Sequence, residues 1–142
     1  MANNVVFSDI ESLREVWPVA AEVASGTPLV NNGKAGVALT ASGGSTKSVT
    51  SGPYTISGIP AGGVGLDALE VSVATTGTFE FTGVVSSGTT PVPTSTAQGT
   101  PVFITSAGAL TLASSGNTAF GRVNYPKGYN KVAGKLPVKI GA

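Results

Sequence analysis

Apolar and polar residues alternate most regularly in the middle of the chain. Apolar side chains occupy every second position from Leu69 to Val73, and the same pattern returns from Phe79 to Phe81. Successive side chains of a β-strand point to opposite faces, so this alternation predicts two half-buried strands. The break between them, "TTG", has the composition of a turn. We therefore expect a β-hairpin over residues 69–82.

Two further segments each pair apolar stretches around a short turn. "TPLVN" and "KAGVALT" flank Asn32-Gly33, the dipeptide best suited to a type I′ turn because both positions tolerate a positive φ. "PVFIT" and "ALTLA" flank Ser106-Ala107-Gly108 in the same way. Both segments predict hairpins. The stretches "NTAFGRVNY" and "KLPVKI" predict two more strands, and Pro137 predicts an edge position for the last one because proline donates no ladder hydrogen bond.

Two stretches between these strands have the composition of loops. Residues 41–65, "ASGGSTKSVTSGPYTISGIPAGGVG", predict loops around a short strand near Tyr54 and Ile56. Residues 86–98, "SSGTTPVPTSTAQ", are rich in threonine and proline and predict an extended, exposed loop.

The first residues have a different pattern. Ser8 and Glu11 have the spacing of a capping box, and apolar residues recur at about helical period as far as Val16. Pro18 would end such a helix. A helix this short is marginal alone and needs a surface to pack on, in this domain or in another subunit.

These patterns together predict an all-β protein. We expect a small β-barrel-like or β-sandwich domain of short strands and hairpins, residues 18–142, preceded by an N-terminal arm, residues 1–17, that carries a short helix. One phrase occurs twice, as "SGTPLVNNGKAGVALT" from Ser25 and as "QGTPVFITSAGALTLA" from Gln98. It indicates either two related hairpins of one domain or a generic strand opener, since glycine allows a tight entry and proline suits a strand start.

Composition narrows the choice of chemistry. The 142 residues include no cysteine and no histidine, which removes disulfides, thiolate metal sites and the commonest general base. Only 11% of residues are charged, against about 25% in an average soluble domain, yet the mean hydropathy of +0.27 argues against disorder. The N-terminus lacks the pattern of a secretory signal and no apolar run is long enough to span a membrane, so we expect synthesis in a cytoplasm and no membrane partner.

Charge is distributed unevenly along the chain. The net charge is +1, but acids prevail in residues 1–22 and the segment from Arg122 onward carries four lysines and no acid. Such asymmetry favours contacts between unlike faces of neighbouring molecules, or else both ends are simply solvated. The lysines recur every four residues, but glycines and a proline exclude a helical stripe, and a pI of about 8.0 argues against nucleic-acid binding.

Few residues offer catalytic chemistry. Asp67, Glu70 and Glu80 could meet if residues 70 and 80 lie on paired strands, but carboxylates on the polar face of a sheet are usually just solvated. The segments around Lys34 and Lys47 lack the glycine-lysine-serine/threonine order of a phosphate-binding loop. We therefore expect no enzyme activity and no catalytic, cofactor-binding or metal-binding residues.

The ordered series of glycine-rich strand phrases resembles the capsid decoration (cement, or head-stabilisation) proteins of tailed bacteriophages. Those sequences run from an N-terminal arm through a "G-x-P-V … G-V-A" hairpin and a "G-x-F/Y" strand to a "G-x-x-V-Y/F" strand and a final "G-x-V" strand. The resemblance spans about residues 18–125. The matching positions are Gly26, Pro28, Gly36 to Ala38, Gly77 to Phe79, Gly99 to Phe103, and Gly121 with Val123.

The resemblance implies a structural virion protein on the outer capsid surface. Such proteins are small β-barrel-like domains, often homotrimers, that bind the expanded head between capsomers and stabilise it by bridging major capsid protein subunits. Their N-terminal arm reaches onto the capsid protein, commonly by strand addition. Carried over to this chain, the capsid-binding arm has these apolar residues: Val5, Phe7, Ile10, Leu13, Val16 and Trp17.

A receptor- or carbohydrate-binding β domain of a phage fibre or adhesin is the alternative. Loops rich in threonine and serine suit adaptable polar contacts. Against it, Trp17 is the only tryptophan and lies in the arm, whereas sugar sites usually present exposed aromatic platforms.

Overall fold

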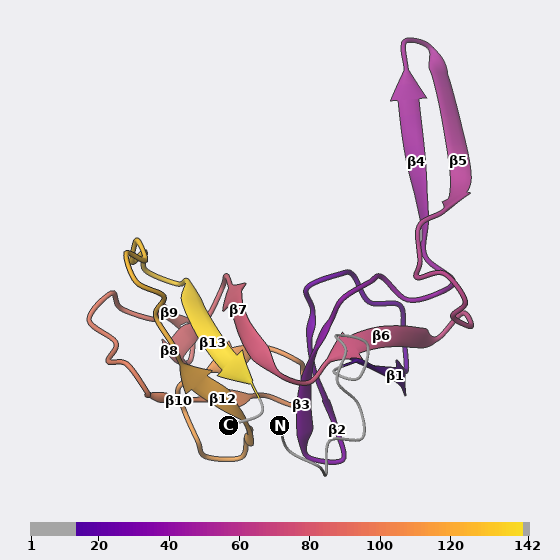
Figure 1. The fold of residues 1–142 in the computed structure, drawn as a ribbon. Helices are drawn as coiled ribbons and strands as arrows, with labels where there is room; N and C mark the ends of the chain where they lie inside the picture. The colour runs from indigo at the N-terminus through magenta and orange to yellow at the C-terminus, as the bar shows by residue number, and fades with distance from the viewer. Residues whose placement is uncertain (1–13, 141–142) are drawn as a thin grey trace, which may run out of the picture. The chain divides into compact units, whose positions relative to one another are not determined.

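The computed structural model describes residues 14–140 and is all-β, as predicted, with curled sheets that form half-barrels (Figure 1). Its strands are β1 (Arg14–Pro18), β2 (Pro28–Asn31), β3 (Lys34–Ala38), β4 (Thr46–Ser51), β5 (Tyr54–Pro60), β6 (Glu70–Ala74), β7 (Gly77–Phe81), β8 (Val85–Ser87), β9 (Thr90–Pro91), β10 (Pro101–Ile104), β11 (Leu110–Thr111), β12 (Thr118–Val123) and β13 (Leu136–Ile140).

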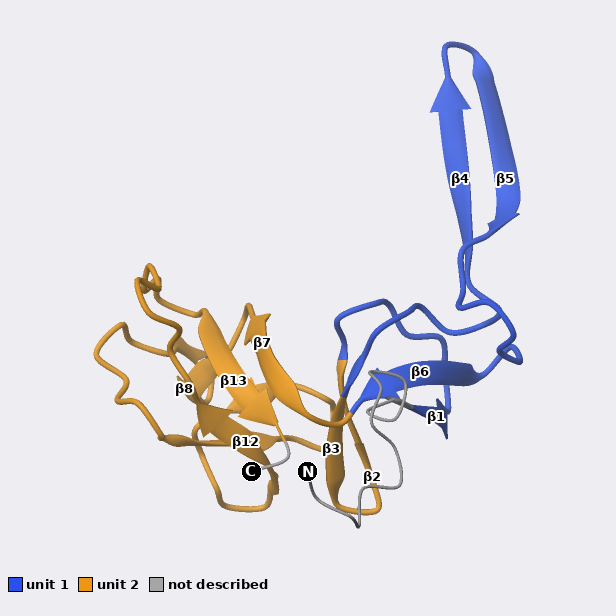
Figure 2. Ribbon diagram, in the orientation of Figure 1, with its two compact units in different colours: residues 1–27, 37–74 blue, residues 28–36, 75–142 orange. Residues whose placement is uncertain are grey.

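The described chain forms two compact units (Figure 2). Unit 1 contains residues 14–27 and 37–74, and unit 2 contains residues 28–36 and 75–140. The chain therefore passes between the units just before β2, within β3 and just after β6. The expected division into an arm of residues 1–17 and one domain of residues 18–142 stays a prediction, since residues 1–13 lie outside the described part.

Unit 1 is built on β6, which lies between β1 and β3. β1 pairs antiparallel with β6 and places Trp17 opposite Val71. Val71 and Val73 are fully buried, as their alternation predicted, and Trp17 is 5% exposed. The core of unit 1 is small, because only six of the eighteen buried apolar residues of the described chain belong to it.

Unit 2 holds the larger core. Its sheet has the order β7-β13-β12-β10-β11-β8-β9, antiparallel except for the parallel β11–β8 pair. Phe81 and Phe120 meet edge to face, with ring centroids 5.7 Å apart, a preferred aromatic geometry. Leu136, Val138 and Ile140 of β13 are also buried. The predicted strands over "NTAFGRVNY" and "KLPVKI" are thus confirmed as β12 and β13.

Both predicted glycine turns of the paired segments are also confirmed. Asn32 and Gly33 have φ values of 52° and 80°, the left-handed pair that a type I′ turn requires, and they join β2 to β3. β10 and β11 pair antiparallel, with Ile104 opposite Leu110, across the turn that contains Gly108.

The repeated Gly-Thr-Pro phrase builds the same turn twice. Gly26 and Gly99 have φ values of 85° and 82°. The hydroxyl of Thr27 donates to the carbonyl of Ala24, and the hydroxyl of Thr100 donates to that of Ala97, each at 2.7 Å. Each phrase then leads into the first strand of a hairpin, as the interpretation of two related hairpins requires.

The hairpin predicted for residues 69–82 is wrong. β6 pairs with β1 and β3, whereas β7 pairs with β13, so the two strands belong to different units. The alternation identified each strand correctly. It could not identify the partners, because the buried side chains of β6 and of β7 belong to two different cores.

The helix predicted for the N-terminal arm is wrong for its last residues, from Arg14 onward, which the structure describes. Arg14–Pro18 form β1, and the other arm residues lie outside the described part. Within β1, Val16 is 55% exposed and Trp17 is buried, which is the two-residue alternation of a strand. The antiparallel pairing with β6 therefore makes this segment a strand, although its apolar residues recur at helical spacing.

The edge position predicted for Pro137 is wrong, because β13 lies between β7 and β12. The carbonyl of Pro137 accepts a 2.9 Å hydrogen bond from the N–H of Asn124, just beyond the end of β12. A residue's N–H and C=O point to the same side of a strand. The nitrogen of Pro137, which has no hydrogen to donate, therefore faces the end of β12 and not β7. The proline therefore interrupts no ladder hydrogen bond to β7.

The exposed loop predicted for residues 86–98 is wrong in part. The segment contains β9, and Val92 is fully buried. Thr96 is also buried, and its hydroxyl donates to the carbonyl of Pro93 at 2.7 Å. Val92 anchors the segment to the core of unit 2, as its N–H donates to the carbonyl of Val84 at 3.0 Å.

Candidate functional site

The segment predicted as loops around a short strand forms a hairpin of β4 and β5 that extends from unit 1 (Figure 1). Ser51 lies opposite Tyr54, so the turn is Gly52-Pro53. Gly52 has a φ of 58°, which suits the first central position of a type II′ turn. A pairing irregularity leaves one extra residue on β5, where Gly58 has a φ of 72°, as in a β-bulge.

The two faces of this hairpin differ in chemistry. Val49 lies directly opposite Ile56, and Tyr54 is on the same face because it is two residues from Ile56. The other face is polar, and the hydroxyls of Thr50 and Thr55 are 3.0 Å apart in a hydrogen bond across the strands. The hairpin therefore has one apolar and one polar face.

Neither face of the hairpin is covered by the rest of the described chain. Every residue of β4 is exposed, and every residue of β5 except Ile59 is exposed. Tyr54 is 76% exposed and Ile56 64%. An isolated two-stranded hairpin is marginally stable in water, so this hairpin is suited to contact with a partner.

Glycines hold the base of the hairpin against the rest of unit 1. The N–H groups of Gly43 and Gly44 donate to the carbonyls of Glu70 and Ala68 at 3.0 and 3.1 Å. A side chain at Gly62 would collide with the backbone carbonyls of Ser42 and Gly43. The close backbone approach explains the two Gly-Gly pairs in this segment, whose composition predicted only loops.

A buried serine secures the same base. Ser42 is completely buried, and its Oγ accepts a hydrogen bond from the N–H of Val23 (3.2 Å) and lies 2.9 Å from Oγ of Ser45. The N–H of Ser42 also donates to the carbonyl of Val23 at 3.0 Å. The hairpin is therefore anchored at its base and exposed along its length.

An open groove of about 650 Å³ lies on unit 1 beside the base of this hairpin. Val64 lines it and is fully exposed, and the Thr40 Oγ1 atom is buried without a hydrogen-bond partner among the described residues. Buried hydroxyls are normally hydrogen-bonded. The complete lining is Val16, Thr40, Gly63, Val64, Gly65, Leu66 and Ser72.

The residues proposed for the capsid-binding arm separate in the structure. Val16 is exposed and lines the groove, whereas Trp17 is 5% exposed and belongs to the core of unit 1. The remaining four, Val5, Phe7, Ile10 and Leu13, lie outside the described residues. β1 is the terminal strand in the sheet order, so within the described chain its outer edge has no neighbouring strand.

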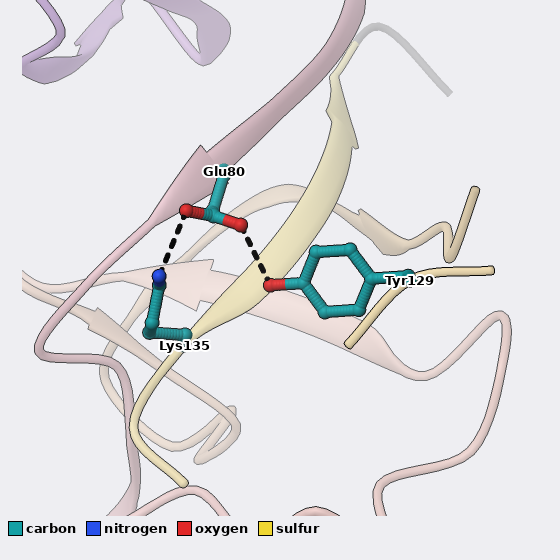
Figure 3. A network of polar contacts seen from close by, with 3 residues as sticks. All are labelled: Glu80, Tyr129 and Lys135. Carbon is teal, nitrogen blue, oxygen red and sulfur yellow. Dashed lines mark hydrogen bonds and ion pairs between the residues drawn. The ribbon is translucent and has the colours of Figure 1, made fainter. Parts of the chain in front are cut away.

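A polar network in unit 2 joins the lysine-rich segment to β7 (Figure 3). The hydroxyl of Tyr129 donates to Glu80 Oε2 at 2.9 Å, and Lys135 Nζ lies 3.1 Å from Glu80 Oε1. The Tyr125 and Tyr129 rings are 5.6 Å apart, and Lys131 Nζ lies 4.3 Å from the centre of the Tyr125 ring. The segment thus folds back on the sheet and is not simply solvated.

The network perturbs both titratable partners. Hydrogen bonds from Tyr129 and Lys135 hold the pKa of Glu80 below its ordinary value. Burial raises the pKa of Tyr129 to about 12, with a further contribution from the hydrogen bond to Glu80. Both carboxylate oxygens of Glu80 are occupied, and the lowered pKa is opposite to what a general acid requires.

The other acids singled out in the sequence do not join Glu80. The N–H of Asp67 donates to Glu70 Oε1 at 2.9 Å, and both residues belong to unit 1, whereas Glu80 belongs to unit 2. The pairing of residues 70 and 80 is therefore wrong. Within residues 14–140, no cluster of three or more acids could hold a metal ion. No helix in that range is long and apolar enough to cross a membrane.

Comparisons of the chain with protein-family models, with curated proteins and with solved structures found no match.

Proposed function

We propose that the protein is a structural virion protein that binds the outer surface of the expanded phage head and stabilises the capsid by bridging major capsid protein subunits. One observation carries the proposal. Among the described residues, six of the seven exposed large apolar side chains belong to unit 1. Burying a side chain of this size contributes roughly 1.5–3 kcal/mol, so a surface with six of them favours association.

The outer edge of β1 supports attachment by strand addition. The N–H and C=O groups along this edge can bond to an extended segment of the capsid protein, and the exposed Val16 adds an apolar contact. The arm residues Val5, Phe7, Ile10 and Leu13 lead directly into this strand. Trp17 takes no direct part in this attachment, because its burial in unit 1 gives it a structural role.

Bridging explains how such a protein stabilises a shell. Several attachment points on one assembly raise the effective concentration of each contact, so weak contacts give a strong total. A protein that binds only the expanded lattice stabilises that state by mass action. The resemblance of residues 18–125 to decoration proteins supports the expanded head as the target. It also supports self-association as a homotrimer.

Co-sedimentation tests the proposal. Purified protein is mixed with compact precursor shells and with expanded heads of the phage that encodes it, and the bound fraction is measured against protein concentration. We expect saturable binding to expanded heads alone. No binding to either form would contradict the proposal.

Removal of residues 1–13 tests the arm within the same assay. The truncation ends before β1 because Trp17 belongs to the core of unit 1. We expect the truncated protein to stay folded, by circular dichroism, and to lose most of its binding to heads. Equal binding by the truncated and full-length proteins would show that the arm is dispensable.

The alternative of a receptor- or carbohydrate-binding domain has one supporting observation. Tyr125 and Tyr129 form an aromatic pair beside the carboxylate of Glu80. However, Lys131 covers one face of the Tyr125 ring, and both oxygens of Glu80 are bonded to Tyr129 and Lys135. These groups therefore already have partners within the cluster. Binding to host polysaccharides on a glycan array, abolished by Tyr129→Ala, would favour this function.

A further inference from the structure

The exposed apolar side chains of unit 1 lie in complementary places. Val49, Tyr54 and Ile56 form the apolar face of the projecting β4–β5 hairpin, whereas Val16 and Val64 line the open groove near its base. A projecting face and a groove with similar chemistry on one unit suit contact between two molecules. Neither is covered by the described residues of the same chain.

The hairpin cannot fill the groove of its own copy. The hairpin and the groove belong to the same compact unit, in which Tyr54 is 76% exposed and Val64 fully exposed. The hairpin base is held by backbone hydrogen bonds at Gly43, Gly44 and Gly63, so the hairpin is not free to fold back. A hairpin that occupies this groove must therefore come from another molecule.

Charge favours a second copy as that occupant. Lys47 is on the exposed hairpin, opposite Ile59, and Asp67 is exposed directly after Leu66 of the groove. Glu70 is two residues before Ser72 of the groove, on the same face of β6. A lysine on the hairpin and acids beside the groove of the same chain attract between copies.

We propose that the apolar face of the β4–β5 hairpin of one copy docks into the groove lined by Val16, Val64 and Leu66 of a second copy. The contact joins two different surfaces, so it is heterologous. It therefore builds a closed ring if the rotation closes and an open chain if it does not.

The test uses purified full-length protein without heads, so its result is independent of capsid binding. One variant disables the hairpin (Tyr54→Ser with Ile56→Thr), and the other disables the groove (Val64→Asp). These side chains are exposed, so the monomer fold is preserved, which circular dichroism and thermal melting verify. Val132→Ser, the same kind of change at the exposed apolar residue of unit 2, is the matched control.

Sedimentation velocity distinguishes the outcomes. We expect the native protein and the Val132→Ser control to sediment as an oligomer, and each of the two disabled variants to sediment as a monomer. Mixing the disabled variants should give a complex of two copies, because the intact hairpin of one fits the intact groove of the other. A monomeric native protein, an oligomeric variant, or a mixture that stays monomeric would each overturn the proposal.

Discussion

Gly26 and Gly99 occupy the same position of the same turn in the two Gly-Thr-Pro phrases. Each N–H donates to a strand carbonyl, from Gly26 to Ala38 at 2.7 Å and from Gly99 to Val123 at 2.9 Å. Their φ values of 85° and 82° are rarely adopted by other residues. The threonine that follows closes the turn with its hydroxyl. The repeat was visible in the sequence, but its hydrogen bonds were not.

Replacing Thr100 by valine removes the side-chain hydrogen bond from one copy of this repeated turn. The hydroxyl bond to Ala97 is lost while the side-chain shape is kept, so we expect the free energy of unfolding to fall by about 1 kcal/mol. Thr27→Val should have a similar effect because it breaks the equivalent bond. Urea denaturation measures both. Thr94→Val, at an exposed threonine, is the control, and an equal loss in that variant would contradict the role of the hydroxyl.

The Tyr129–Glu80 hydrogen bond predicts an alkaline dependence of stability. Tyr129 has a pKa of about 12 in the folded protein against 10.0 ordinarily. Its contribution is therefore fully present below pH 10 and is lost as the pH rises from 10 to about 12. We expect the stability difference between the native protein and Tyr129→Phe to shrink across this range. A difference that stays constant to the upper end would contradict the assignment.

At the scale of elements, local patterns identified strands better than they identified strand partners. The Asn32-Gly33 turn was predictable because its two residues alone determine the geometry. The pairing of β13 with β7 was not, because the chain supplies them more than fifty residues apart. Pro137 misled for a related reason, since its cost depends on where the neighbouring β12 ends.

The β4–β5 hairpin was only partly predictable from its sequence. Tyr54 and Ile56 gave a strand signal, but the serines and threonines of β4 and the bulge at Gly58 hid the pairing. The glycines of its base resembled loop residues, although they are required by close backbone contacts. The groove was not predictable, because Val16 and Val64 are distant in sequence.

Gly62→Ala tests the base of the hairpin. The added Cβ would meet the backbone carbonyls of Ser42 and Gly43, which cannot turn aside as a flexible side chain could. We expect a loss of about 1–3 kcal/mol in the free energy of unfolding, as in overpacked cores. Amide exchange at Ala61 and Gly63 should also become faster, because both N–H groups bond at this base.

Gly52→Asn is the matched control for that substitution. Gly52 has a positive φ but nothing near its missing side chain, and asparagine tolerates this conformation. The control carries only the strain of a side chain at a positive φ, so it should lose less stability than Gly62→Ala. Comparable losses in both variants would show that the close contact at Gly62 is unimportant.

At the scale of the whole molecule, core and interaction surface are divided between the two units. Unit 2 contains twelve of the eighteen buried apolar residues of the described chain, whereas unit 1 contains six of its seven exposed large ones. Unit 2 thus has the composition of a stable body, and unit 1 that of a binding surface. This division is the basis on which we propose that unit 1 and the arm that precedes it make the contacts, both between copies and with the head.

Cryo-electron microscopy of expanded heads, with and without the added protein, tests this central claim most directly. The account predicts added density on the outer face between neighbouring capsomers, with unit 1 closer to the shell than unit 2. Heads that show no added density, or density that contacts the shell through unit 2 alone, would contradict it.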